Sequence, residues 1–323
     1  MAAPIGTYVV SDTSSTRGGL REDLSDMIYQ ISPTDTPLMS TLAKSKATAV
    51  YHEWQTDSLA AATSGNALVE GYDAVATTAS PTYRLGNYTQ IVGKTVSVSG
   101  TLEAVDKAGR KSEKAYQLAK ASSEIKRDIE AILFANQGKS AGSSSSARLM
   151  GSMLSWLKSN TAYNTSDGAD PATAGTSTRT DGTTRTFTED MLKEVIREAY
   201  INGGNPKVCY VSPIGKQKVS TFAGIAQQRY QAPSDAPTTI IGAADVYLSD
   251  FGSISIVPDR FMRTRDAIVV DPEYAALAYL RPFQTVELAK TGDAERTQLI
   301  AELTLEMRNE AAHGIVADLD FSK

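Results

Sequence analysis

Residues 112–138 read SEKAYQLAKASSEIKRDIEAILFANQG, and their apolar side chains recur at the spacing of one helical face. The positions that share this face are Ala115, Leu118, Ser122, Ile125, Ile129 and Ile132. Ser112 is of a type that caps helix starts and Gly138 of a type that ends helices, so the sequence predicts a helix over 112–138. Such a helix would be roughly 35–40 Å long. Its polar side predicts the ion pairs Lys120–Glu124 and Lys126–Glu130.

A second feature precedes this helix. Residues 51–59, YHEWQTDSL, hold a Tyr, a Trp and one of the two histidines, and residues 59–80 are mostly Ala, Thr, Ser and Gly. NYTQIVGKTVSVSG (87–100) then alternates as a strand does. We expect the aromatic stretch and this strand to be the two legs of one long hairpin. Its tip has too little apolar mass for a core, and a lone hairpin is marginal in water. Its aromatic base fits either an active site or a surface that another copy covers.

The N-terminal part predicts an extended arm followed by short helices. Residues 1–19 are small and polar, and residues 20–31 (LREDLSDMIYQI) have one apolar helical face. Thr36 is expected to cap a second short helix with Pro37 at its first position.

The C-terminal half predicts an α/β unit and then strands. Residues 187–275 alternate helix and strand patterns, and the first helix turns inward Leu192, Val195, Ile196 and Ala199. Residues 160–186 are polar and read as loops, with a hairpin turn at Asp181-Gly182. The last 50 residues are mostly strand, and the fold class is therefore α+β.

Composition excludes several classes of protein. The chain has 323 residues, 41% hydrophobic and 21% charged, as expected of a globular protein. A net charge of −5 argues against a nucleic-acid binder held by bulk positive charge. Cys209 is the only cysteine, so no disulfide forms within the chain. No signal peptide and no apolar run of about 20 residues is present, so we expect a soluble protein without membrane contact, made in a cytoplasm.

The search for chemistry ends without a site. Dinucleotide, P-loop, nucleophile-elbow and zinc-protease motifs are absent. His52 and His313 have no nucleophile elbow to serve, and Cys209 lies on an apolar strand typical of core packing. The polar loop contains Asp167, Asp170 and Asp181 without metal-loop spacing, although a loosely held Ca²⁺ or Mg²⁺ remains an alternative. We therefore predict no catalytic residue, cofactor or metal, and no enzymatic activity.

One charge feature stands apart. Residues 107–127 hold seven basic residues against two acidic ones, a local charge of +5. The simplest interpretation is a solvated helix face. The alternative is a face turned toward a polyanion, carried by Lys107, Arg110, Lys111 and Lys114, which stand at the helix start where the helix dipole disfavours them.

Several strings, taken in order along the chain, resemble the major capsid protein of tailed bacteriophages with the HK-ninety-seven-type fold. They are ISPTDTPLMSTL (31–42), HEWQTDSL (52–59), EGYDA (70–74), SEKAYQLAKASSEIKRDIEAIL (112–133), NPKVCYVSP (205–213) and EMRNEAAHGIV (306–316). They resemble one capsid family within that fold, formerly known only as a domain of unknown function. The likeness spans nearly the whole chain except 138–186.

The resemblance implies a division of the chain. Residues 1–48 would be an N-terminal arm with short helices and 49–98 an extended loop. Residues 99–140 would hold the spine helix of a peripheral domain, 141–265 an axial domain with a polar insertion at 160–186, and 266–323 the strands that return through the peripheral domain to the axial domain.

The resemblance also implies a function and partners. The chain would self-assemble into pentamers and hexamers of an icosahedral head that encloses double-stranded DNA, located in the virion and assembled in the host bacterial cytoplasm. A portal protein at one vertex, scaffolding and decoration proteins, and packaged DNA would be further partners. Contacts between subunits are expected at Tyr51, His52, Trp54, Asp57, Glu70 and Tyr72, and contacts with DNA at Lys107, Arg110, Lys111 and Lys114.

Two other functions remain open at this point. The same fold forms bacterial nanocompartments, similar to encapsulins, that enclose enzymes. A soluble enzyme with a hidden site in residues 187–275 is the third possibility.

Overall fold

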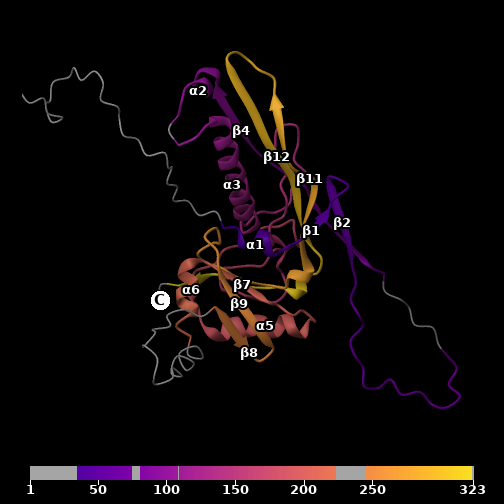
Figure 1. The fold of residues 1–323 in the computed structure, drawn as a ribbon. Helices are drawn as coiled ribbons and strands as arrows, with labels where there is room; N and C mark the ends of the chain where they lie inside the picture. The colour runs from indigo at the N-terminus through magenta and orange to yellow at the C-terminus, as the bar shows by residue number, and fades with distance from the viewer. Residues whose placement is uncertain (1–34, 75–80, 108, 223–244, 322–323) are drawn as a thin grey trace, which may run out of the picture.

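The computed structural model describes residues 35–74, 81–107, 109–222 and 245–321. The expected arm and the helix over 20–31 lie outside these residues. Two sheets organise the rest (Figure 1). The first has the order β1-β11-β12-β4, and its strands are β1 (Ala43–Lys46), β4 (Gln90–Ser99), β11 (Ala275–Leu288) and β12 (Ala294–Met307). β1 runs parallel to β11, and the other pairs are antiparallel.

The long helix lies along this four-stranded sheet. α3 (Glu113–Leu133) runs beside β4, and the short helix α2 (Gly100–Ala104) joins the two (Figure 1). β4 alternates as a strand with one covered face should, because Val92 and Val98 are buried while Ile91 is 48% exposed.

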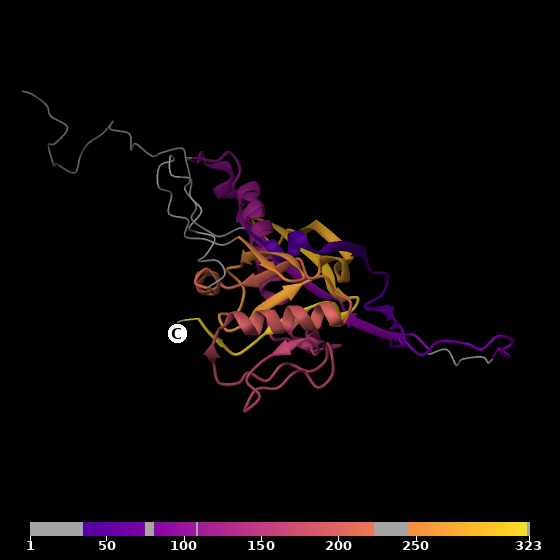
Figure 2. The ribbon, with the colours of Figure 1, turned by 90° about the horizontal axis from the view of Figure 1, so that it is seen from below.

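The second sheet has six strands in the order β5-β13-β10-β7-β9-β8. They are β5 (Thr161–Ala162), β7 (Val208–Val211), β8 (Val246–Ser249), β9 (Gly252–Pro258), β10 (Ala267–Val270) and β13 (Gly314–Val316). Figure 2 shows α5 (Glu189–Ile201) running across this sheet. The four inward residues predicted for α5 are all buried, which confirms its amphipathic pattern.

Short elements complete the described chain. Ser212 caps α6 as expected, since its side chain accepts a hydrogen bond from the Gly215 amide. A separate two-stranded hairpin projects from the body. The elements are α1 (Pro37–Thr41), α4 (Met153–Trp156), α6 (Pro213–Val219), two 3₁₀ turns (Pro272–Tyr274 and Glu310–Ala312), β2 (Tyr51–Thr56), β3 (Tyr83–Tyr88), β6 (Arg185–Thr186) and β14 (Leu319–Asp320).

Two buried clusters form the core. One joins α1, α3 and α4 to β12 and one face of the six-stranded sheet, and its largest fully buried side chain is Trp156. The other lies between α5 and the opposite face of that sheet, and it includes Cys209, confirming the expected core position. The first cluster contains residues of both sheets, so its packing joins the two sheets into one body.

The structure corrects the limits and the face of the long helix. Ser112 caps it as predicted, because its hydroxyl accepts from the Ala115 amide at 3.2 Å. The helix ends at Leu133 rather than at Gly138. Gly138 serves a close approach instead, since a Cβ there would lie 2.1 Å from the carbonyl oxygen of Thr176. Ala115 is exposed, and the most buried side turns inward Ala121, Ile125, Ile129, Glu130 and Leu133.

The structure also corrects two hairpins. The return leg of the projecting hairpin is β3, which pairs with β2 from Tyr51↔Tyr88 to Thr56↔Tyr83. The strand expected as that leg is β4, which pairs with β12. The turn expected at Asp181-Gly182 is wrong as well, because β6 pairs with β14 and the Gly182 amide donates to the Asp318 carboxylate at 2.8 Å.

Glu130 has a role that the sequence reading did not assign. Of the two ion pairs expected on α3, Lys120–Glu124 forms at 3.9 Å. Glu130 instead is fully buried and accepts from the amides of Leu38 at 2.6 Å and Met39 at 2.9 Å. It thereby satisfies two of the unpaired donors at the start of α1, where the expected cap makes no side-chain cap bond.

Burial, with Asp259 as a hydrogen-bonding neighbour, raises the pKa of Glu130 from 4.5 to about 8. The folded protein therefore holds a proton that the unfolded chain releases. This contribution to stability is complete below about pH 4.5 and is lost as the pH rises through about 8.

We expect Glu130→Gln to remove part of this pH dependence. The neutral amide cannot ionise, so the fall in unfolding free energy between pH 5 and 8 should shrink by about 1–3 kcal/mol. Denaturant unfolding at several pH values measures this change, with the exposed Glu70→Gln as control. A variant that loses stability with pH as steeply as the original protein would contradict this assignment.

Candidate assembly surfaces

The projecting hairpin is fixed to the body at its base. The Asn87 side chain is fully buried and donates to the carbonyl oxygens of Gly151 at 3.1 Å and Leu305 at 2.8 Å. Its own oxygen accepts from the amide of Gly151 at 2.8 Å. One amide side chain therefore ties β3 to β12 and to the segment before α4.

His52 ties the other strand to β12. Its Nε2 lies 3.2 Å from Oε2 of Glu306, which also accepts from the Ser45 hydroxyl at 2.6 Å. Burial would raise the pKa of Glu306, but the hydrogen bonds from Ser45, Arg308 and His52 outweigh it and lower that pKa. A charged carboxylate is therefore held where β2 meets β12 and β1.

Trp54 packs within its own chain. It is partly buried against the core, and its ring centroid lies 5.4 Å from that of the fully buried Trp156. Across the hairpin it faces Leu85. This environment makes Trp54 part of the support of the hairpin.

The tip of the hairpin is exposed. Asp57 and Glu70 are exposed, and Tyr72 is 50% exposed. The sequence reading overlooked the other apolar residues near them, which are Leu59 (99% exposed), Val69 (78%), Leu68 (69%) and Tyr83 (65%). Their scarcity among Ala, Thr and Gly hid them. Figure 2 shows the described parts of the hairpin extending away from the body, in agreement with the exposure of these side chains.

Two of the four residues expected to face DNA make hydrogen bonds or ion pairs with residues close to them in the sequence. Lys107 is 7% exposed in its side chain and donates to the carbonyl oxygens of Glu103 at 3.0 Å and Val105 at 3.2 Å. Arg110 pairs with the carboxylate of Glu113.

The other two differ from each other. Lys114 reaches across the sheet to Glu287 at 3.1 Å and Glu295 at 3.4 Å. Lys111 is exposed and forms no ion pair with any residue that the structure describes. The acidic residues that balance this basic run come from α2, β11 and β12. The charge count along 107–127 therefore overstated the net positive charge of this region.

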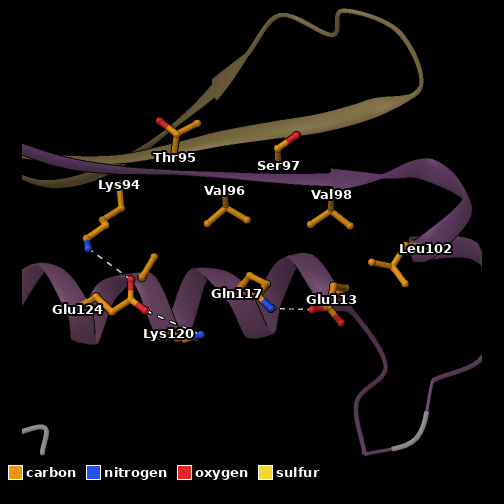
Figure 3. A pocket seen from close by; sticks show the side chains of 11 residues that line it. Lys94, Thr95, Val96, Ser97, Val98, Leu102, Glu113, Gln117, Lys120 and Glu124 are labelled. Carbon is orange, nitrogen blue, oxygen red and sulfur yellow. Dashed lines mark hydrogen bonds and ion pairs between the residues drawn. The ribbon is translucent and has the colours of Figure 1, made fainter. Parts of the chain in front are cut away.

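A polar groove lies near this run, between β4, α2 and α3. It measures about 440 Å³, and its walls include Lys94, Val96, Val98 and Gln117 (Figure 3). Lys94 lies 3.1 Å from Asp128 and 3.5 Å from Glu124, and Gln117 donates to Glu113 at 2.7 Å. The polar groups thus satisfy one another, an arrangement that does not resemble a catalytic pair.

The remaining candidates for chemistry are structural in this fold. His313 is fully buried, its Nδ1 accepts from the Asp271 amide at 3.1 Å, and burial lowers its pKa to about 4. Burial raises the pKa of the Cys209 thiol to about 12. In the polar loop, Asp170 pairs with Arg179 at 2.6 Å.

The other two loop acids also bind protein groups, Asp167 the amide of Thr183 and Asp181 the guanidinium of Arg263. Within the described ranges, no three His, Cys, Asp or Glu side chains are grouped as metal ligands would be. Among the described helices, none has both the length and the apolar character to cross a bilayer.

Several solved structures have a similar fold. The capsid subunit of Cyanophage A-1(L) matches with a TM-score of 0.67 at 11% identity, over 93% of this chain and 97% of that one. The SrpI encapsulin of Synechococcus elongatus PCC 7942 matches with a TM-score of 0.55 at 9% identity, over 94% of each chain. At these identities the likeness shows the fold alone, which confirms the expected HK-ninety-seven-type α+β class.

The sequence then decides between these relatives. The chain belongs to the SU10 major capsid protein family, whose profile matches residues 6–320. The "Major capsid protein" of Escherichia phage Phieco32 is 27% identical over 341 aligned positions, covering 93% of this chain and 94% of that protein. The chain is therefore a phage major capsid protein, a structural subunit that assembles with copies of itself into the shell of the virion.

The packing of Trp54 leads to a prediction. Trp54→Ala should lower the unfolding free energy of the unassembled subunit by about 2 kcal/mol, because a large, partly buried ring leaves a gap against Trp156. Tyr72→Ala should change it by less than about 0.5 kcal/mol, because that ring is half exposed. Denaturant titration of both variants measures the difference. Equal stability of the two variants would mean that Trp54 contributes little to the packing of its own chain.

Proposed function

We propose that the subunit works in a closed icosahedral shell of pentamers and hexamers, and that the tip of its β2–β3 hairpin is buried by a neighbouring copy. The observation that carries this proposal is the exposed apolar set at the tip, at Leu59, Leu68, Val69 and Tyr72. Permanent interfaces typically bury more than about 2,000 Å² in total, so the tip would be one of several contacts.

Within this proposal the six hairpin residues have two roles. Asp57, Glu70 and Tyr72 are exposed on the tip and would contact the neighbour. Tyr51, His52 and Trp54 lie at the base, where their described contacts are with their own chain, and would hold the hairpin for that contact.

The two sheets correspond to two working parts. The four-stranded sheet with α3 would be the peripheral domain, and the six-stranded sheet with α5 and α6 the axial domain around the pentamer and hexamer centres. β10 (Ala267–Val270) and β13 lie in the six-stranded sheet, whereas β11 and β12 lie in the four-stranded sheet. The segment that returns through the peripheral domain would therefore begin near residue 275, at β11, and not at residue 266 as expected.

The shell would enclose double-stranded DNA and would be assembled in the host bacterial cytoplasm. A portal protein at one vertex, with scaffolding and decoration proteins, would complete the head. The subunit would act without catalysis, since each candidate for chemistry has a structural role. Contact with DNA would be weak and without base recognition, because Lys107, Arg110 and Lys114 already bind groups of their own chain.

A nanocompartment shell is the second candidate, because the SrpI encapsulin has the same fold. Membership of a phage capsid family favours the first candidate. DNA rather than enzyme cargo inside purified particles would distinguish them.

A double substitution at the tip tests the proposed function. Leu59→Ser with Val69→Ser should leave the unfolding free energy of the free subunit within about 0.5 kcal/mol, because both side chains are exposed. It should strongly reduce the yield of closed particles, measured by sedimentation and electron microscopy.

The matched control is Ala61→Ser with Ala67→Ser, which adds the same two hydroxyls to the same tip while removing little apolar surface. Normal particles from the Leu59/Val69 variant would refute burial of the tip by a neighbour.

Lys111 allows a separate test of the expected contact with DNA. In a filled particle, the exposed Lys111 should lie on the inner surface, and Lys111→Gln should leave the amount of packaged DNA nearly unchanged because single phosphate contacts are weak at physiological salt. Cryo-electron microscopy and DNA quantification measure the two outcomes. Lys111 on the outer surface would exclude the DNA-facing role.

A further inference from the structure

Lys139 occupies a rigid place beside the base of the hairpin. It follows α3, and its amide donates to the carbonyl oxygen of Gly175 at 2.7 Å. The next residue, Ser140, exchanges two backbone hydrogen bonds with Leu149 at 2.9 and 3.0 Å. Hydrogen bonds therefore fix the backbone of Lys139 and of the residue after it. The position from which the Lys139 side chain extends is defined.

The side chain reaches from this place to the hairpin. Nζ donates to the carbonyl oxygen of Gly86 in β3 at 2.6 Å and to the hydroxyl of Tyr51 in β2 at 3.2 Å. It also lies 5.4 Å from the ring centroids of both Tyr51 and Trp156. A single ammonium group thus contacts both strands of the hairpin and the buried ring beneath them.

Two glycines pack closely against the aromatic rings beside the ammonium group and limit the movement of these rings. A Cβ at Gly86 would lie 2.8 Å from the Tyr51 ring, so only glycine lets the ring lie over β3. Gly175, at φ +73°, approaches Trp156 so closely that a Cβ there would lie 2.5 Å from the ring. The two rings that flank the ammonium are therefore held by backbone on their other sides.

The positive charge of Lys139 has no acidic partner among the described residues. In the described part of the chain, no carboxylate lies within ion-pair distance of its Nζ, and its partners are a carbonyl, a hydroxyl and two aromatic faces. Partial burial of a cation without a counter-ion is a poor source of stability. Carbonyl and ring contacts are directional, however, and they specify an orientation.

We propose that Lys139 is a positioning residue that sets the direction in which the β2–β3 hairpin leaves the body. Asn87 and His52 attach the hairpin at its base, and the Lys139 ammonium fixes its rotation about that attachment. The consequence for assembly rests on the proposed function: a hairpin whose direction varies little meets the neighbouring copy within the narrow range of angles that pentamers and hexamers need, so the particles share one diameter.

The direct test measures the hairpin in the unassembled full-length subunit. Cys209 is fully buried, so spin labels at Ser64→Cys on the tip and Lys193→Cys on α5 report one distance by double electron–electron resonance. Lys139→Met should broaden this distance distribution about twofold while the midpoint of thermal unfolding stays near that of the original protein. Lys139→Arg, which keeps the cation, should retain the narrow distribution, and Lys207→Met is a control for loss of a surface lysine.

Assembly gives the second measurement. Lys139→Met particles should be heterogeneous in diameter, and Lys139→Arg particles uniform. An unchanged distance distribution in Lys139→Met would overturn the positioning role whatever the particles look like. A large loss of thermal stability in Lys139→Met would also overturn it, because Lys139 would then be a packing residue. A broadened distribution with uniform particles would uphold the positioning role and contradict the proposed contact of the tip with a neighbour.

Discussion

A two-stranded ribbon in water is marginally stable, and this constraint governs the structure. Among the strands that the structure describes, β2 and β3 pair only with each other, and the apolar residues of their tip are exposed. The ribbon therefore depends on its base, where Asn87, the His52–Glu306 pair and the tilted contact between the Trp54 and Trp156 rings join it to β12 and α4. The core of the body thus supports an element whose tip is exposed in the described chain.

Charged side chains also attach α3 to its neighbours at both ends. The basic stretch at the start of α3 is balanced by carboxylates of α2, β11 and β12, so that three separate segments meet at the upper end of the helix. At the lower end, Glu130 holds the first turn of α1. α3 is thus an attachment point at both ends, for β11 and β12 near its start and for α1 near its end.

Local sequence patterns predicted several elements but not their partners. The Ser112 cap and the inward face of α5 follow from such patterns, whereas the capsid family was suggested by the resemblance of whole strings of residues. The return leg of the hairpin did not follow, because β4 and β3 are adjacent strand-like stretches and only the covering helix α3 selects β4 for the sheet. Glu130 and Lys139 were missed for a related reason: their partners lie 92 and 53 positions away, and no spacing rule reaches that far.

The two 14-residue strands β11 and β12 give the subunit a mechanical direction. β12 is hydrogen-bonded along its length, to β11 on one side and β4 on the other, and it runs from the far end of the four-stranded sheet into the central core. A pull along this axis loads the rungs of both ladders together, in shear, whereas a pull across it would open them one after another. The subunit is therefore a stiff strut along β12 and a compliant sheet across it, a material whose strength depends on the direction of strain.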